Sequence, residues 1–486
     1  MAGSNTIFGN TISLKIQAKA EKQKNKYLHK FGDDQQQHYP IGISDDLVLT
    51  PAFNMQKIIP SDSNCPLANN KAIIIGNIRM GYGHYRIAMA IASAARHLGY
   101  TPYWFDLTAF PETTGSKVIN HLNKLYSLGS RISQKSKLFN HFYWEPLNSE
   151  GFRKLDFNAM DQKLTELMTP IFKNLPKDIP FIGTHTWTAQ AAVHAKMQTV
   201  INVIPDNWPM ALHLAEGAIH AVQTPSCYFG YKTLKGMSKE NTNPMPEKSL
   251  YNVGHYIDHE LLQDLEQDTA KRLDRIEHNK AKRLLLTIGG AGAQYDLYKE
   301  IILNNMQQIK QGSLVIYVNI GDHIKVLKQL THDLKYVNDD VFIHQNDWQD
   351  TQDFTEAALN KEDLKGIHLF YDENLFSAVY TTNLLMRSCD LLITKPSELA
   401  FYPVPKLMIK RVGGHEAYGA LCAAEIGDGT TECTTNAEIH NILAILLTDH
   451  ELLTEMNNNI LKAKRHGIYD GAYKVVELAL NNTKDN

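Results

Sequence analysis

Hydrophobic positions along Lys71–Asp106 predict a strand, a glycine-containing turn, a helix and a second strand. Four consecutive apolar residues, Ala72–Ile75, are typical of a strand buried on both faces. The helix is indicated by apolar residues spaced three and four apart, at positions 87, 88, 91, 94, 95 and 98. Glycines 76, 81 and 83 precede this helix and Gly99 ends it. The turn therefore lies at a helix N-terminus, where free N–H groups and the helix dipole favour an anion.

Strands and helices alternate along the rest of the chain in two sets, which predicts an α/β fold with mostly parallel sheets. In the first set, residues 116–178 have helical periodicity, and strands are predicted at 181–185, 199–205 and 218–224. In the second set, the apolar runs lie at 283–290, 313–321, 341–344, 367–371, 390–394 and 406–410. Two further helices are predicted at 436–447 and 450–482.

These patterns divide the chain into five parts. Residues 1–68 are polar and predict an N-terminal extension with one lysine-bearing helix at 12–30. Two Rossmann-like domains are predicted, the first over 69–265 and the second over 284–465. A charge-dense helical connector is predicted at 266–283. A C-terminal helix is predicted at 466–486, and through it the chain can cross back to the first domain.

The amino-acid composition argues against several classes of function. The chain has 486 residues, of which 43% are hydrophobic and 21% charged, with a net charge of −3, so we expect a globular protein without a nucleic-acid partner. Five cysteines without CxxC spacing argue against a disulfide framework or a zinc site. No signal-peptide pattern and no membrane-length apolar run is present, which predicts a cytoplasmic protein without a transmembrane segment.

Residues that could bind a ligand or catalyse a reaction come directly after the predicted strands. Open α/β sheets bind their ligands at these strand ends. Gly289–Gly292 is suited to a diphosphate, and a ligand-free tight turn is the alternative. Lys395–Glu398 and His415-Glu416 end two successive strands, and helix capping is the alternative role of these carboxylates. Asp206 ends a first-domain strand, where it is either a base or a turn former.

In their order and placement, these motifs resemble the GT-B glycosyltransferases, specifically the group containing monogalactosyldiacylglycerol synthase and the N-acetylglucosaminyltransferase that forms lipid II. Gly81-Tyr82-Gly83-His84 resembles the acceptor-side GxGH turn of that family, and Gly289–Gly292 its donor loop. The stretch 397–416 resembles the segment that holds the uridine ribose and the donor sugar. The resemblance implies a GT-B fold, with two Rossmann-like domains facing each other across a cleft.

The resemblance also implies an activity, namely inverting, metal-independent transfer of a sugar from a UDP-sugar co-substrate to an unidentified acceptor, without another cofactor. His84 or Asp206 is the implied catalytic base. The implied donor-binding residues are Gly289, Gly290, Gly292, Lys395, Ser397, Glu398, His415 and Glu416. Gly81, Gly83 and Arg86 are expected on the acceptor side. No DxD-like carboxylate pair ends a strand, so no metal site is expected.

Three questions stay open at this point. Another nucleotide-sugar chemistry, such as that of an epimerase or hydrolase, fits the same residues. A non-catalytic GT-B-shaped binding protein is favoured by the short Lys395–Glu398 loop, where the family has a longer one, and opposed by the retained Glu398 and His415-Glu416. The acceptor is unidentified, with a lipid and a glycan as the candidates. The aromatic stretch 139–144 and the N-terminal lysines suit a peripheral membrane contact, and their alternative roles are core packing and a solvated helix.

Overall fold

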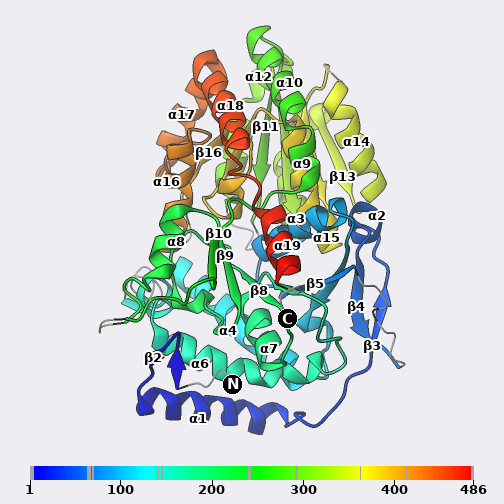
Figure 1. Cartoon of the computed structure of the whole chain (residues 1–486). Helices are drawn as coiled ribbons and strands as arrows, with labels where there is room; N and C mark the ends of the chain where they lie inside the picture. Colours follow the sequence, from blue (N-terminus) through cyan, green and yellow to red (C-terminus); the bar gives the residue numbers. More distant parts are fainter. Residues whose placement is uncertain are drawn as a thin grey trace.

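Two parallel-stranded sheets, each with its own helices, make up most of the chain (Figure 1). The computed structural model describes residues 5–62, 67, 71–136, 138, 142–143, 146–238, 242–289, 294–361, 363–411 and 413–482. A separate two-stranded hairpin, β1 (Thr6–Ile7) and β2 (Asn10–Thr11), lies at the start of the chain.

The first domain is built on an eight-stranded sheet with the order β10-β9-β8-β7-β5-β6-β4-β3. All neighbouring strands are parallel except β3 and β4. Its strands are β3 (Ile41–Ser44), β4 (Gln56–Pro60), β5 (Ala72–Asn77), β6 (Thr101–Asp106), β7 (Phe181–Gly183), β8 (Val200–Val203), β9 (Ile219–Val222) and β10 (Leu250–Asn252). Its helices are α1 (Leu14–Phe31), α2 (Leu49–Phe53), α3 (Gly83–His97), α4 (Thr114–Lys135), α6 (Leu155–Thr165), α7 (Thr186–His194) and α8 (Pro225–Lys232), with short turns η1 (Leu107–Ala109), η3 (Leu147–Gly151), η4 (Glu166–Phe172) and η5 (Ala211–His213).

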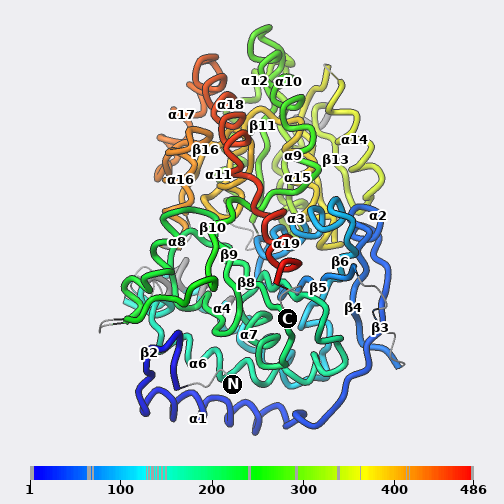
Figure 2. The backbone as a smooth tube through the Cα atoms, viewed as in Figure 1, coloured from blue at the N-terminus to red at the C-terminus, as the bar shows by residue number. Residues whose placement is uncertain are grey.

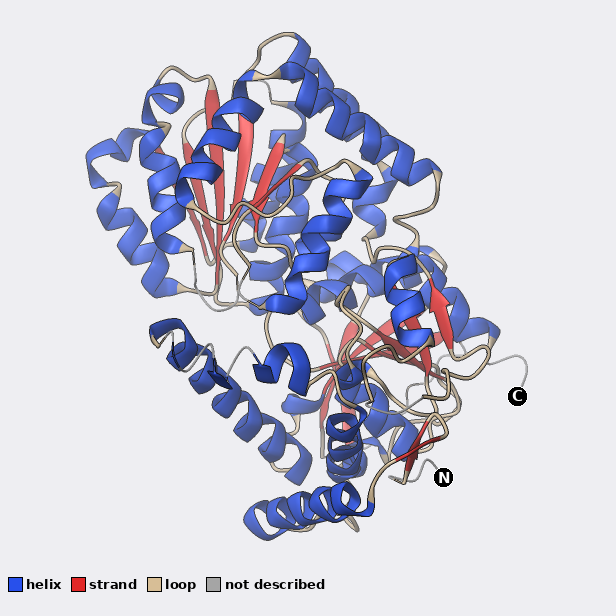
Figure 3. Ribbon diagram, turned by 90° about the vertical axis from the view of Figure 1, so that its left-hand side faces the viewer, coloured by secondary structure: helices blue, strands red, loops and turns tan. Residues whose placement is uncertain are grey.

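The second domain is built on a six-stranded, fully parallel sheet with the order β13-β14-β12-β11-β15-β16, and Figure 3 shows helices on both of its faces. Its strands are β11 (Lys282–Thr287), β12 (Leu314–Gly321), β13 (Val341–Gln345), β14 (Ile367–Tyr371), β15 (Leu391–Thr394) and β16 (Lys406–Met408). Its helices are α9 (His259–Gln263), α10 (Leu265–Glu277), α11 (Tyr295–Asn304), α12 (Met306–Lys310), α13 (Ile324–Asp333), α14 (Trp348–Asn360), α15 (Leu375–Ser388), α16 (Ala417–Ile426), α17 (Asn436–Thr448) and α18 (His450–Arg465), with short turns η6 (Lys335–Asp340), η7 (Glu398–Phe401) and η8 (Gly414–Glu416). The two-domain α/β fold with mostly parallel sheets that the sequence predicts is confirmed.

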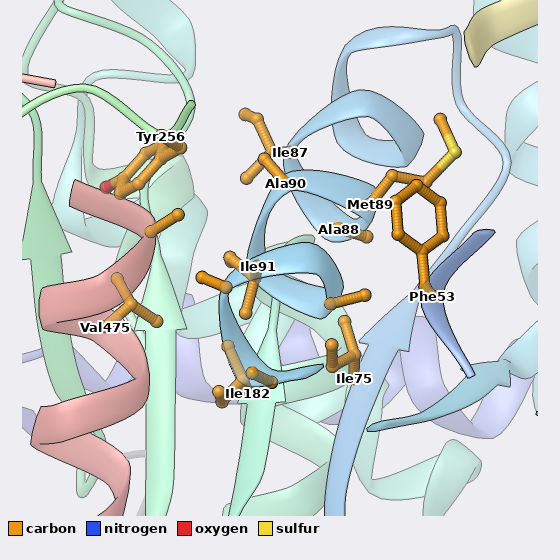
Figure 4. Packing of buried hydrophobic residues seen from close by; sticks show 14 of the residues in the cluster. Phe53, Ile75, Ile87, Ala88, Met89, Ala90, Ile91, Ile182, Tyr256 and Val475 are labelled. Carbon is orange, nitrogen blue, oxygen red and sulfur yellow. The ribbon is translucent and has the colours of Figure 1, made fainter. Parts of the chain in front are cut away.

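Helix α3 is buried on every side rather than along the single apolar stripe that its sequence indicates. It lies on β5 of its own sheet, and α19 (Gly471–Asn481) and α2 flank it, as the labelled Val475 and Phe53 show in Figure 4. Helix α15 of the second domain also packs against it. The small residues of α3, several of them alanines, allow these close neighbours, and the resulting apolar core is shared by both domains.

The C-terminal part differs from the single helix predicted at 450–482. The chain leaves α18 at Arg465 and resumes as α19 at Gly471, and Gly467 between them has a φ of +68°, a conformation that ends helices. Helix α19 then packs on α3, β7 and β8 of the first domain, and the red end of the trace in Figure 2 runs from the second domain into the first.

The polar extension predicted for residues 1–68 is also different in the structure. Strands β3 and β4 form the edge of the first sheet, and Phe53 of the intervening α2 is fully buried. The sequence hides this role because each strand is short and several of its residues are only partly buried. Helix α1 matches the helix predicted at 12–30, and it packs on α6 and α4. Among the described residues, no helix combines the length and the apolar character that crossing a bilayer requires.

The buried histidine His220 gives a testable pH dependence. Burial lowers its pKa to about 4, so it stays neutral in the folded protein and gains a proton more readily when unfolded. Its contribution to stability is therefore complete above pH 6.5, and each pH unit of acidification from there towards 4 removes about 1.4 kcal/mol. Urea unfolding measures this contribution. The free energy of unfolding of wild type minus that of His220→Gln should fall by about 1.4 kcal/mol for each pH unit between pH 6.5 and 4.

Other buried groups titrate in both proteins, so their effect cancels when the free energies of unfolding are compared at the same pH. Exposed His38 provides the matched control, because its replacement by Gln should change the free energy of unfolding by less than about 0.5 kcal/mol. A pH-independent difference for His220→Gln would contradict the assignment of a neutral buried imidazole.

Candidate functional site

The candidate site lies where the carboxyl ends of the two sheets meet. The turn that follows β5 contacts residues that follow β12 and β15, and it does so from the N-terminus of α3. Gly81 has a φ of +106°, a conformation that glycine adopts readily, and this lets the turn reverse just before the helix.

Tyr82 reaches from this turn into the second domain. Its hydroxyl donates to Asp322 Oδ1 at 2.5 Å and accepts the Asp322 N–H at 3.1 Å. Gly321 makes room for the ring, since a Cβ there would lie 2.4 Å from the Tyr82 oxygen. Burial and the Asp322 carboxylate raise the pKa of Tyr82, so the hydroxyl keeps its proton and remains a donor. Arg79 pairs with the same carboxylate from an exposed position.

Arg86, predicted on the acceptor side, lies instead in the core between the domains. Only 2% of its surface is exposed, and its Nη1 donates to the Val379 carbonyl at 3.1 Å and to Asn383 Oδ1. The Asn383 amide in turn donates to both oxygens of Asp258 at 2.9 Å. Burial and the neighbouring Glu260 raise the pKa of Asp258 to about 7. Arg86 therefore joins α3 to α15 of the second domain.

Glu398, the predicted ribose ligand, lies against the start of α3. Its Oε1 is 3.6 Å from Arg86 Nε, and a Cβ on Gly83 would lie 3.0 Å from its Oε2. A helix N-terminus favours a carboxylate, and the missing side chain of Gly83 permits the close approach. Thus Gly83 and Glu398, predicted on opposite sides of the site, are in contact.

His84 points back into the first domain. Its Nδ1 donates to the Thr184 carbonyl at 2.6 Å, which leaves Nε2 as the acceptor nitrogen of the neutral ring. Burial lowers the pKa of His84, and the Thr184 bond and the charge of Asp206 offset only part of this. A neutral imidazole held in one tautomer is suited to accept a proton.

Asp206 belongs to a chain of hydrogen bonds beside His84. His213 Nε2 lies 3.3 Å from Asp206 Oδ2, and His213 Nδ1 lies 2.8 Å from the Tyr231 hydroxyl. The Met210 N–H donates to that hydroxyl, so the hydroxyl proton is available to His213 Nδ1. His213 then donates through Nε2 and orients the Asp206 carboxylate. The two predicted bases thus have different partners.

Lys395, which is partly exposed, forms an ion pair with the buried Glu416, the residue predicted to meet the donor sugar. Burial alone would lower the pKa of Lys395, but the carboxylates of Glu416 and Glu398 outweigh it and hold the pKa above its usual value. Ser397, whose N–H donates to the Lys395 carbonyl at 2.8 Å, leads into η7, the turn that begins at Glu398. The lysine is therefore a fixed cation among three carboxylates that include Asp206.

The predicted donor loop is described only at its first residue. The Gly289 carbonyl accepts from His323 Nε2 at 3.0 Å, and a Cβ on Gly289 would lie 3.7 Å from Lys395 Cε. The loop thus begins beside the lysine. Gly290, Gly292 and the side chain of His415 lie outside the described residues.

Two residues join the site that were not predicted in it. His185 follows β7, and its ring centroid is 4.8 Å from that of His84. Partial burial and the charge of Asp206 raise the pKa of Tyr126 on α4, which places this tyrosine beside the same group of charges. The strand-end rule that singled out Asp206 applies equally to His185, whereas Tyr126 lies within a helix and carries no such signal. Within the described part of the chain, no three His, Cys, Asp or Glu side chains are grouped to hold a metal ion.

Two family models match successive parts of the chain. Residues 6–233 match a domain of unknown function (DUF6937), and residues 245–480 match a second domain of unknown function (DUF6938). The second match begins before β10, the last strand of the first sheet. No curated protein is significantly similar to the chain in sequence.

Many solved structures are similar along most of the chain, and three of them illustrate the likeness. The UDP-GlcNAc 2-epimerase of Neisseria meningitidis, bound to UDP-GlcNAc, is 12% identical with a TM-score of 0.47, and the match covers 84% of this chain and 99% of that one. The α,α-trehalose 6-phosphate synthase of Burkholderia multivorans is 10% identical with a TM-score of 0.43, covering 86% and 99%. S. aureus MnaA, in a structure with UDP, is 11% identical with a TM-score of 0.44, covering 85% and 97%.

Separate substitutions of Arg86 and Arg79 test whether Arg86 stabilises the contact between the two domains. Arg86→Met removes a buried cation and leaves Glu398 and Asn383 without their partner, so it should lower the free energy of unfolding by about 3 kcal/mol. Arg79→Met is the matched control: its pair with Asp322 is exposed, and the loss should stay below about 1 kcal/mol. Urea unfolding measures both values, and equal losses would contradict the role of Arg86.

Proposed function

We propose that the chain is a glycosyltransferase that moves a sugar from a UDP-sugar to a hydroxyl acceptor by an inverting, metal-independent reaction. The observation that carries the proposal is the meeting of a fixed acceptor nitrogen, on His84, with a partly buried cation, Lys395, at the junction of the two sheets. His84 interacts electrostatically with Asp206 and Glu398, and Lys395 interacts with the same two carboxylates.

The first domain supplies the base. An acceptor hydroxyl that donates to His84 Nε2 loses its proton to that nitrogen as its oxygen bonds to the anomeric carbon of the sugar. The ring becomes positively charged, and the Asp206 carboxylate stabilises that charge. Attack from the first-domain side, opposite the departing diphosphate, inverts the anomeric centre.

The second domain supplies the groups for the departing diphosphate. When the bond between the anomeric carbon and the diphosphate oxygen breaks, negative charge grows on that oxygen. Lys395 is held as a cation next to the start of the Gly289 loop, and its proposed role is to stabilise the charge on the departing diphosphate. Glu398 is the group proposed to accept hydrogen bonds from the ribose hydroxyls.

Donor binding is the first test of this proposal. Wild type should bind UDP in calorimetry, and Glu398→Gln should weaken binding about 10-fold to 100-fold, because hydrogen bonds to a charged acceptor are lost. Glu477, which is exposed on α19, gives the matched control Glu477→Gln with unchanged affinity. Absence of UDP binding by wild type would overturn the proposal.

Catalysis by His84 is the second test. His84→Ala should lower the turnover number by about 10²-fold to 10⁴-fold and leave UDP affinity unchanged, while exposed His38→Ala changes neither. Since burial lowers the pKa of His84, the acid limb of the wild-type profile should lie below pH 6.5. Release of free sugar alone would identify a hydrolase, and exchange at a sugar carbon an epimerase.

A further inference from the structure

Strand β13 forms the outer edge of the second sheet, where β14 is its only neighbour among the described strands. Just after β13, the Asn346 N–H donates to the Tyr371 carbonyl of β14 at 3.0 Å. Successive residues of a strand direct their backbone groups to opposite edges, so those of Ile343 and Gln345 point away from β14. The edge is also apolar at the surface, since Ile343 is 44% exposed and its neighbour Phe342 46%. An exposed edge of this kind is a template for a further strand.

A groove of about 500 Å³ adjoins this edge and is lined by residues of β13, of α13 and of the start of η6. Its apolar residues are Ile324 and Leu327 of α13 and Ile343 of β13. Gln345 lines it as well, because side chains alternate along a strand and Ile343 and Gln345 share one face. A strand added to the edge would continue this alternation and direct every second side chain to the groove side. The groove can thus take an apolar side chain from an extended segment.

The groove also carries positive charge. Lys328 of α13 and Lys335 at the start of η6 both line it and are exposed. Neither lysine forms an ion pair within the part of the chain that the structure describes, and Lys335 lies over the ring of Tyr336, which does not neutralise its charge. Asp333, between the two lysines in sequence, is held instead by Lys299 at 2.8 Å. Charge complementarity therefore favours an acidic occupant.

We propose that the groove binds an extended, acidic segment of a partner protein, which adds to the outer edge of β13 as an additional strand. The backbone of the segment pairs with the outward N–H and C=O groups of β13. One apolar side chain enters the groove against Ile324 and Leu327. Acidic side chains on the same face of the segment pair with Lys328 and Lys335.

A second copy of this chain is less suited to the groove. Antiparallel pairing of two β13 strands about a two-fold axis perpendicular to the sheet would keep both α13 helices on the same face. Lys328 and Lys335 would then approach lysines of the other copy, and like charges across an interface are unfavourable. The proposal is independent of glycosyl transfer, since no residue of the groove takes part in the proposed reaction.

The test uses the full chain and two seven-residue peptides, TETLTET and the charge-reversed TKTLTKT, each labelled with fluorescein at its N-terminus and amidated at its C-terminus. In an extended TETLTET, the glutamates and the leucine share one face, and the threonines, which favour strands, share the other. Fluorescence anisotropy should show saturable binding of TETLTET with a dissociation constant below about 1 mM, and binding of TKTLTKT about 10-fold weaker or more.

N-methylated peptides test the pairing of the backbones. The N–H groups of alternate residues in a strand point to the same edge, so methylation of the leucine and second glutamate nitrogens removes donors from one edge only. Methylation of the two central threonine nitrogens removes donors from the other edge. One of these peptides should bind about 10-fold more weakly or worse, because its hydrogen bonds to β13 are lost, and the other should bind as TETLTET does.

Charge reversal on the protein tests the two lysines. The double variant Lys328→Glu/Lys335→Glu should weaken TETLTET binding about 10-fold or more. The double variant Lys310→Glu/Lys361→Glu is the matched control, because it changes the net charge equally at exposed lysines that do not line the groove, and it should keep the wild-type affinity.

Three results would overturn the proposal: no saturable binding of TETLTET, equal binding of TKTLTKT, or an equal loss of affinity for both methylated peptides. Light scattering provides the outcome for a second copy of the chain. A wild-type dimer that Ile343→Lys converts to a monomer would show that the edge pairs with itself, and this too would overturn the assignment to an acidic partner.

Discussion

The burial of one charged side chain determines how the two domains meet. Arg86 begins on a first-domain helix, is almost fully buried, and finds its hydrogen-bond acceptors on α15 of the second domain. A buried guanidinium without partners is strongly unfavourable, so separating the domains would expose or orphan this charge. Glu398 adds a counter-charge 3.6 Å away, which ties the same arginine to the candidate site. Domain closure and the position of Glu398 are thus set by one residue.

Helix geometry explains why neighbouring residues of the turn serve different domains. Residues four apart share a helix face, and Tyr82 and Arg86 both reach the second domain. His84 lies two residues from each, about 200° around the axis, and so its ring is directed back to β7. Inserting one residue between Tyr82 and Arg86 would rotate one relative to the other by about 100°, so the two side chains would no longer share a face. The spacing, more than any single residue type, gives the turn its role at the junction.

The sequence was sufficient for elements whose signal is local. The strand Ala72–Ile75, its turn and α3 followed from a continuous apolar run, glycines and helical spacing, and the second set of strands followed in the same way. Strand ends also led to His84, Asp206 and Lys395, which the fold brings to one junction.

The sequence was insufficient wherever a second segment decides the outcome. In the sequence, Arg86 is a polar residue next to a predicted ligand-binding turn. Only the packing of α15 against α3 makes it a core residue. Strands β3 and β4 form because the open edge at β6 accepts them. The pairing of Lys395 with Glu416 joins residues 21 apart on successive strand ends, which spacing alone does not reveal.

Under the proposed function, a donor must exchange partners that the site already holds. Lys395 is paired with Glu416, and Glu398 lies between Arg86 and the N-terminus of α3. A diphosphate that approaches Lys395 brings negative charge towards three carboxylates, so it gains less from the lysine than an isolated cation would give. Ribose hydroxyls that bind Glu398 likewise compete with the contact that holds the domains together. Donor binding and domain closure are consequently coupled through Glu398, because the same carboxylate takes part in both.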